Sequence, residues 1–331
     1  MSDRDRVRDP ISHRPWRHVV DEQATAREAD AARRVGDSNL ASVSTARGVR
    51  VVGAAVLVVG LVAAGAGVSA AGPVARPRYV ALGDSFTAGP LIPGRAPGPP
   101  GCLRSSRNYP RLVAKALGAD LRDESCSGAT TAALVAPQRL GRGANRPQLD
   151  ALDAGTGIVT LGISGNDIGF GAILGACAAA VPLGRPCQDR FVGPRGDEIA
   201  RRIAEAGARV AAILAEVARR APSARVFLVG YPAILPEHDL GCFPLLPIAF
   251  ADVSYLRDKQ KELNAMLESR AAAVGVGYVD IYRPSVGHDA CSLPGIRWVE
   301  PVVPLAPAAP VHPNAKGMRG MAAEVVRAIR R

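Results

Sequence analysis

Aromatic side chains are scarce in this sequence: they make up 4% of the residues, within a total of 48% hydrophobic residues. The core must therefore be built mostly from Ala, Val, Leu and Ile. No two cysteines have the Cys-x-x-Cys spacing of a zinc site, so neither a metal nor another cofactor is expected. The net charge of +11 comes without a nucleic-acid-binding motif or basic residues interleaved with aromatics, so nucleic acid is not an expected partner.

Cysteine is missing from the N-terminal part of the chain. The cysteines are even in number and stand at positions 102, 126, 177, 187, 242 and 291. Disulfides persist in oxidising compartments, which places the domain that carries these cysteines outside the membrane. Six cysteines allow fifteen pairings, and their spacing alone does not choose among them.

The N-terminal region differs sharply from the rest. Residues 1–50 carry many charges of both signs and no apolar periodicity, which predicts a disordered polar leader. Val51–Ala71 contains no charged residue, and a helix of that length spans about 30 Å, one bilayer core. Residues 51–72 are therefore either a transmembrane signal-anchor or the apolar region of a signal peptide, with Val68-Ser-Ala70 as an acceptable cleavage site. A buried helix of a soluble domain is the third alternative.

A serine stands where a nucleophile would lie in the segment Tyr79-Val-Ala-Leu-Gly-Asp-Ser-Phe-Thr-Ala-Gly89. The apolar run Tyr79–Leu82 predicts a buried strand that breaks at Gly83. A serine just after a parallel strand, here Ser85, lies at the carboxyl edge of the sheet, where open α/β folds bind their ligands. Gly-Asp-Ser is also ordinary turn chemistry, and we expect Asp84 to cap the turn that presents Ser85.

Three later segments complete the pattern. Ser125-Cys-Ser-Gly-Ala129 contains Gly128, whose backbone can approach a bound group closely because it has no Cβ. Gly162-Ile-Ser-Gly-Asn-Asp-Ile-Gly169 offers the amide of Asn166, and His312-Pro-Asn-Ala-Lys-Gly317 offers an imidazole. Over about residues 76–331 the chain resembles the SGNH (GDSL-type) hydrolases. The four residues that name this family match Ser85, Gly128, Asn166 and His312.

The resemblance implies a serine ester hydrolase. Ser85 would attack the acyl carbon while His312 takes its proton. The backbone N–H groups of Ser85 and Gly128 and the side chain of Asn166 would form the oxyanion hole. No Gly-x-Ser-x-Gly elbow surrounds Ser85, which disfavours an α/β-hydrolase despite the shared chemistry.

Two other histidines after Pro73 are alternatives to His312 as the base. His238 lies in a polar loop and is expected at the surface. His288 precedes Asp289, but residues adjacent in sequence seldom orient each other's rings. We therefore assign the base to His312.

The acid of a triad is missing at its usual place. Most family members carry an aspartate three residues before the histidine, and here that position is Ala309. The secreted branch that this chain resembles uses Ser–His dyads in which a backbone carbonyl holds the ring. The resemblance therefore implies a dyad of Ser85 and His312.

The same secreted, three-disulfide branch implies sequential pairing, which gives Cys102–Cys126, Cys177–Cys187 and Cys242–Cys291. It also implies an extracellular location, with the catalytic domain of residues 73–331 either secreted or held outside by a membrane anchor.

Beyond Pro73, short apolar runs alternate with amphipathic segments. This pattern predicts an α/β fold, a three-layer α/β/α sandwich around a parallel sheet. The resemblance implies the flavodoxin-like strand order 2-1-3-4-5. Expected strands cover 78–82, 119–124, 157–161, 225–229 and 277–281. Expected helices cover 108–118, 197–220, 252–273 and 314–330, with Asp197 as an N-cap, and long loops are expected at 89–101, 182–194, 232–247 and 292–310.

The prediction is therefore an extracytoplasmic lipase or carboxylesterase that cleaves acyl esters of lipids through an acyl-enzyme. Two alternatives stay open. The same site would serve a polysaccharide acetylesterase, although few Trp and Tyr are available to stack on sugars. The chain would otherwise be a non-catalytic, membrane-tethered binding module. We expect a monomer, with membrane contact through residues 51–72 if that segment is retained.

Overall fold

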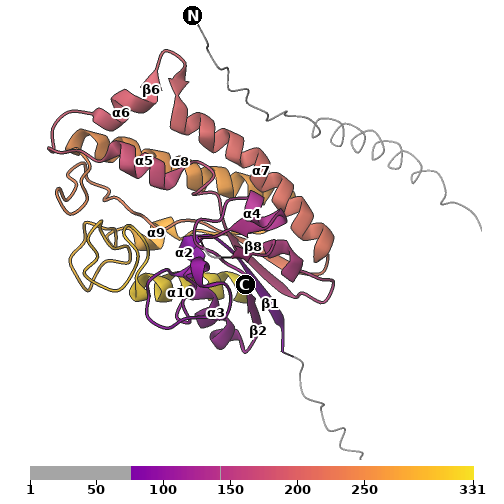
Figure 1. The fold of residues 1–331 in the computed structure, drawn as a ribbon. Coiled ribbons are helices and arrows are strands. Elements are labelled where there is room, and N and C mark those ends of the chain that lie inside the picture. The colour runs from indigo at the N-terminus through magenta and orange to yellow at the C-terminus, as the bar shows by residue number, and fades with distance from the viewer. Residues whose placement is uncertain (1–75, 142) are drawn as a thin grey trace, which may run out of the picture. The chain divides into compact units, whose positions relative to one another are not determined.

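A parallel sheet of five strands lies at the centre of the folded part of the chain that the structure describes (Figure 1). The computed structural model describes residues 76–141 and 143–331. The strand order is β2-β1-β5-β8-β9, which confirms the expected order 2-1-3-4-5. All neighbouring strands of this sheet are parallel. The strands are β1 (Arg78–Gly83), β2 (Asp120–Asp123), β5 (Ile158–Gly162), β8 (Arg225–Val229) and β9 (Gly277–Val279).

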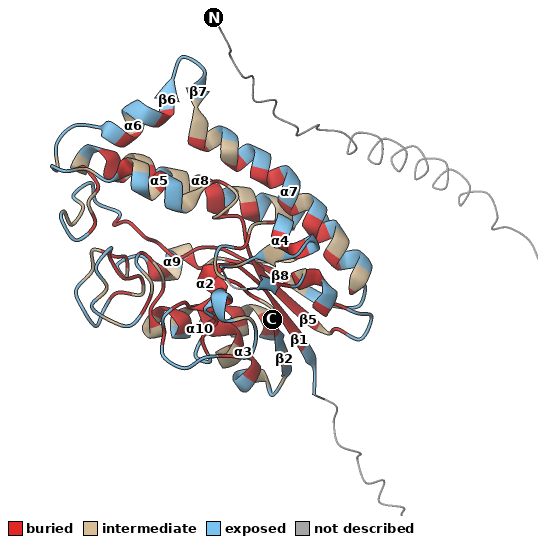
Figure 2. Cartoon of the chain, in the orientation of Figure 1, coloured by how far each residue is buried: buried red, intermediate tan, exposed pale blue. Residues whose placement is uncertain are grey.

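Helices cover both faces of this sheet, which confirms the three-layer arrangement. Tyr79 and Ala81 of β1 belong to one buried cluster, and Val80 and Leu82 belong to the other. Because successive strand residues point into two separate cores, the strand is apolar throughout, and Figure 2 shows the sheet as buried. The first cluster lies under α3 (Tyr109–Leu117) and α10 (Ala315–Arg330), and the second under α7 (Glu198–Arg220) and α8 (Phe250–Val274).

Side-chain caps explain where three of the four long helices begin. Asp197 accepts hydrogen bonds from the N–H groups of Ile199 and Ala200, at 2.9 and 3.1 Å, which confirms it as the N-cap of α7. Asn108 and Asn314 cap α3 and α10 in the same way. These caps are local features of the sequence, which is why the predicted helix boundaries agree with the structure.

The segment 182–194 is not the simple loop that the sequence predicted, because it contains the helix α6 (Pro186–Phe191) and the strand β6 (Val192–Gly193). The carboxylate of Asp252, on α8, accepts hydrogen bonds from the N–H groups of Cys187 and Gln188, both at 2.9 Å. The capping group is distant in sequence, so the local pattern does not reveal this helix.

The remaining elements are short. They are the helices α2 (Ser85–Ala88), α4 (Ala132–Val135), α5 (Phe170–Cys177) and α9 (Tyr282–Ser285), the 3₁₀ turns η1 (Pro100–Cys102) and η2 (Gln148–Ala151), and the strands β3 (Gln138–Arg139), β4 (Ala144–Asn145) and β7 (Gly196–Asp197).

The expectations for residues 1–50 and 51–72 lie outside the described residues. Among the residues from 76 onward that the structure describes, no helix combines the length and the apolar character that crossing a membrane requires.

Candidate active site

Ser85 lies at the carboxyl end of β1, as the first residue of the short helix α2. Its N–H therefore has no intrahelical acceptor. The turn before it depends on Gly83, where a Cβ would come within 2.3 Å of the Thr87 hydroxyl and 2.5 Å of the Gly162 carbonyl oxygen. The side chain of Gln148 bonds to both the N–H and the carbonyl of Gly83, at 2.8 and 3.0 Å. This end of β1 is therefore closely packed, and it holds Ser85 in one place.

Asp84 is buried and joins the serine turn to the segment that follows β8. Its carboxylate accepts hydrogen bonds from the Phe86 N–H, at 2.9 Å, and from the Tyr231 hydroxyl, at 2.6 Å. The Tyr231 oxygen in turn accepts the N–H of Gly165, at 2.7 Å. Burial raises the pKa of Asp84 to about 7, against the lowering effect of the bonds from Tyr231 and Phe86. Asp84 caps the turn as expected, whereas no sequence motif marks Tyr231.

His312 lies at the entrance of α10, and both of its ring nitrogens have partners. Nε2 is 2.8 Å from the hydroxyl oxygen of Ser85, and Nδ1 is 2.7 Å from the carbonyl oxygen of Pro310. A carbonyl can only accept, so Nδ1 carries the proton and Nε2 accepts from Ser85 in the neutral ring. Burial lowers the pKa of His312 below its ordinary value, and the bond to Pro310 opposes this shift. The geometry is that of a serine paired with a base, without a carboxylate on the ring.

The segment before His312 is fixed by several backbone contacts. The Ala309 N–H bonds to Pro90 O at 3.0 Å, and the His312 N–H closes a turn onto Ala309 O at 3.2 Å. Val311 has a φ of 57°, a left-handed conformation that is rare for a β-branched residue. This turn directs the Pro310 carbonyl at the imidazole of His312.

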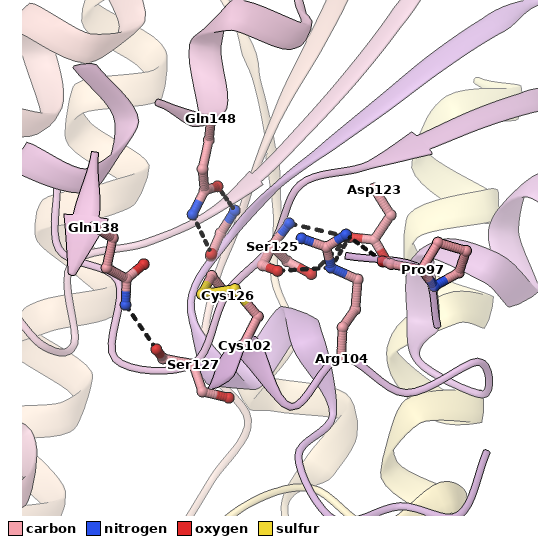
Figure 3. Close-up of a disulfide and its surroundings, with 10 residues drawn as sticks. Pro97, Cys102, Arg104, Asp123, Ser125, Cys126, Ser127, Gln138 and Gln148 are labelled. Carbon is pink, nitrogen blue, oxygen red and sulfur yellow. Dashed lines mark hydrogen bonds and ion pairs between the residues drawn. A yellow bond between two sulfur atoms is a disulfide. The ribbon is translucent and has the colours of Figure 1, made fainter. Parts of the chain in front are cut away.

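Gly128 lies in a turn that a disulfide holds (Figure 3). Its φ of 77° favours glycine. The Cys102–Cys126 bridge joins this turn to the segment before α3, and the Ser127 N–H bonds to Cys102 O at 3.0 Å. The amide of Gln138 donates to Ser127 O at 2.8 Å.

A buried arginine supports the same turn from beneath. In Figure 3, Arg104 lies between Asp123 and Ser125. Its Nε donates to Ser125 O at 2.7 Å and lies 3.6 Å from a carboxylate oxygen of Asp123, while Nη1 donates to Pro97 O at 2.9 Å. Gly128 is therefore attached to a rigid, cross-linked segment.

Asn166 reaches the same region from the loop after β5. Its side-chain nitrogen donates to Ala129 O at 2.9 Å, so one of its two N–H groups is already used, and the other is available to a ligand. The next residue, Asp167, accepts from the N–H and the hydroxyl of Thr131, at 3.0 and 2.6 Å. These contacts connect the Asn166 loop to the segment that follows Gly128.

A pocket with mostly apolar walls begins at Ser85 and Asn166. Phe86 and Phe170 line it near His312, with ring centroids 4.9 and 6.4 Å from the imidazole. Two polar side chains, Lys259 and Gln260, also contribute to its wall. Its aliphatic lining includes Ile173 and Leu174 of α5, Leu256 and Leu263 of α8, and Leu246 and Ile248 between β8 and α8.

Of the two competing histidines, one is exposed and the other has partners of its own. His238 is exposed. His288 bonds to Ile296 O at 2.8 Å through Nδ1 and stacks on Trp298, with centroids 5.1 Å apart. The neighbouring Asp289 accepts the Cys291 N–H at 2.9 Å and so shapes the disulfide loop.

Three disulfides occur in the structure, and all six cysteines are used. They are Cys102–Cys126, Cys177–Cys187 and Cys242–Cys291, the sequential pairs that the resemblance implies. No group of acidic, histidine or cysteine side chains in the described part of the chain has an arrangement suited to a metal ion.

Known proteins with this pattern identify the class. The chain matches the GDSL-like Lipase/Acylhydrolase family over residues 81–319 and belongs to it. Lipase 2 of Streptomyces coelicolor is 44% identical over 231 residues, which cover 68% of this chain and 76% of that protein. Lipase 1 of the same organism is 31% identical over 242 residues, or 70% of this chain and 79% of its own.

Two solved structures share the fold: phospholipase A1 from Streptomyces albidoflavus NA297 and the extracellular lipase from Streptomyces rimosus. Each has a TM-score of 0.62 at 27% identity and covers 76% of this chain, with 98% and 99% of the respective structures matched. The chain is thus a carboxylic ester hydrolase with the SGNH hydrolase fold.

Proposed function

We propose that this protein is an extracellular serine lipase or carboxylesterase, with Ser85 as nucleophile and His312 as its only side-chain partner in proton transfer. The observation that carries the proposal is the 2.8 Å bond from Ser85 Oγ to His312 Nε2, beside a pocket with mostly apolar walls. His312 takes the serine proton during attack and returns it to the leaving alcohol, and water then hydrolyses the acyl-enzyme by the same route.

The oxyanion donors we propose are the N–H groups of Ser85 and Gly128 and the free N–H of the Asn166 side chain. Each comes from a segment that hydrogen bonds or a disulfide hold in place. Loss of one such donor typically raises the barrier by about 2.7–4 kcal/mol. Pro310 O fixes the tautomer of His312, which is the role of the aspartate in a triad, with less stabilisation of the imidazolium.

Acyl esters of lipids are the substrates we propose, because the aliphatic lining next to Ser85 suits an acyl chain better than a sugar. The three disulfides and the extracellular Streptomyces rimosus lipase favour an extracellular location for this chain as well. In this proposal residues 73–331 form the monomeric catalytic domain, and residues 51–72 direct export or anchor it.

A fluorophosphonate probe tests the nucleophile. Mass spectrometry is expected to locate the adduct on Ser85, and Ser85→Ala is expected to abolish both labelling and ester hydrolysis with the circular dichroism spectrum unchanged. An adduct on Ser127 or Ser164 would contradict the assignment.

A chain-length series of p-nitrophenyl esters, beside a phospholipid and acetylated xylan, tests the substrate class. Preference for xylan would favour the polysaccharide acetylesterase.

A further inference from the structure

Two surface segments near the active site carry no exposed charge, although 21% of the chain is charged. Residues 240–249 contain no charged side chain. Residues 290–311 contain only Arg297 and Glu300, and these are 3% and 1% exposed. We call the two segments together the apolar rim.

Large apolar side chains of the apolar rim face solvent. Val303 is 65% exposed and Leu305 is 63% exposed, and Leu240 and Leu293 are similarly exposed. Single exposed apolar residues are ordinary, but several on adjoining segments without charge between them mark an interaction surface.

Two links make the apolar rim one surface. The Cys242–Cys291 disulfide joins the segments, and the Val302 N–H bonds to Leu245 O at 3.2 Å. In Figure 1 the second segment forms the large yellow loop beside α9, and Figure 2 shows long stretches of that loop as exposed.

Buried polar contacts fix the backbone of the loop that carries Leu305. The Glu300 carboxylate accepts the N–H groups of Leu305 and Ala306, at 3.0 and 3.2 Å. It also accepts the side-chain amide of Asn314, the N-cap of α10, at 2.6 Å. The backbone of the loop is therefore anchored at Leu305 and Ala306 by a buried carboxylate.

The apolar rim is continuous with the site. Its second segment leads directly into His312, and its first segment supplies Leu246 and Ile248 to the apolar pocket next to Ser85, which we call the acyl pocket. Any surface on which the apolar rim docks therefore lies close to Ser85. An acyl ester in that surface could enter the pocket directly.

We propose that the apolar rim docks the enzyme onto the uncharged or zwitterionic surface of aggregated lipid. This inference rests on the proposed lipid-esterase function. The absence of exposed charge matches an interface without net charge, and the continuity with the acyl pocket favours lipid over a second copy of the chain. Binding of this kind scales with the apolar area that enters the interface.

A site-specific reporter tests the docking in the full chain. Because the reporter responds only at its own position, membrane contact by the N-terminal segment does not produce the signal. The emission of the parent, which comes from Trp16 and Trp298, is the reference for each variant. Beyond that reference, Val303→Trp is expected to add a blue-shifted emission with phosphatidylcholine vesicles, and brominated acyl chains are expected to quench this added emission. The matched control is Val274→Trp at the end of α8, at the opposite edge of the sheet, where neither effect is expected. Equal quenching at the two positions, or none at Val303→Trp, would overturn the proposal.

Kinetics separates docking from catalysis. The double variant Val303→Glu, Leu305→Glu is expected to lose about tenfold or more in the rate on phosphatidylcholine vesicles, because it places charge in the interface. Its kcat/KM on soluble p-nitrophenyl butyrate, and both rates of Val274→Glu, are expected to stay at the parent level. If the parent does not hydrolyse the soluble ester, the proposed function fails. If the double variant keeps its vesicle rate, or sedimentation shows that it disrupts a dimer instead, only the docking proposal fails.

Discussion

At the scale of the residue, the imidazole of His312 is held by a main-chain carbonyl and a hydroxyl. Its protonation state therefore depends on burial more than on charge. Asp289, the acid that follows His288 in sequence, accepts hydrogen bonds from the Cys291 N–H and the Ser292 hydroxyl.

Replacement of that acid tests the dyad. Asp289→Asn is expected to lose less than roughly a hundredfold in turnover, whereas the amide replacement in a true triad costs about ten-thousandfold. His312→Ala is expected to lose nearly all activity. Steady-state rates on a soluble ester provide the measurement, with circular dichroism as the control for folding. A ten-thousandfold loss in folded Asp289→Asn would show that a triad exists.

The pH profile follows from the burial of His312. Only the neutral ring can accept the Ser85 proton, and burial moves the pKa below the ordinary value of 6.5. The ring therefore stays neutral to a lower pH, and the acid limb of kcat/KM on a soluble ester is expected to have its midpoint below 6.5. A midpoint at or above that value would mean that the charged ring is stabilised in the free enzyme.

Tyr231 is expected to act as a positioning residue. Tyr231→Phe leaves the Asp84 carboxylate and the Gly165 N–H without their shared partner, at a cost of about 1–3 kcal/mol for each buried group. The phenyl ring stays packed on Phe86, so KM is expected to change little. The lost bonds to Asp84 and Gly165 are expected to lower kcat about tenfold or more, because they help to position the serine turn and the Asn166 loop.

The matched control for Tyr231 is Tyr79→Phe, which removes another buried hydroxyl, one bonded to Thr160 at 2.7 Å. It is expected to lower thermal stability by a similar amount without lowering kcat. If the two variants lose kcat equally, the role of Tyr231 is only structural.

At the scale of the element, the end of β1 and the start of α2 are so close that only glycine fits between them. Gly83→Ala is expected to destabilise the protein by roughly 1–3 kcal/mol, because the new methyl group meets the Gly162 carbonyl and Thr87. Gly175→Ala on α5, where a Cβ meets nothing within 4 Å, is expected to stabilise it by about 0.5–1 kcal/mol. Urea denaturation measures both, and shifts of the same sign would contradict this description.

The elements also show how far the sequence predicts the structure. The five strands and four long helices could be predicted, because apolar runs and caps such as Asp197 are local. The helix α6 could not, because its cap is Asp252 on another element. The candidate site shows the same difference between local and distant signals. Sequence motifs predict Ser85 and His312, whereas the supporting contacts of Gln148 and Tyr231 form only when distant segments pack together.

At the scale of the whole molecule, the disulfides divide into those that support the site and those that support its surroundings. The double variant Cys102→Ala, Cys126→Ala is expected to lose about 2–4 kcal/mol of stability and, because the Gly128 turn loosens, about tenfold or more in turnover on a short soluble ester. Cys177→Ala with Cys187→Ala is expected to lose stability while it keeps that turnover, because this bridge joins α5 to α6. Rates measured well below both unfolding midpoints provide the test, and equal turnover in the two variants would contradict it.

The bond between Ser85 and His312 joins residues that are 227 positions apart in the chain. During synthesis the serine leaves the ribosome long before the histidine exists, and the base takes its place only when the last helix docks on the sheet. In the proposed mechanism, every unfinished or still unfolded copy therefore lacks the base that its serine needs. If that mechanism holds, the fold itself delays the activity of this hydrolase until synthesis is complete.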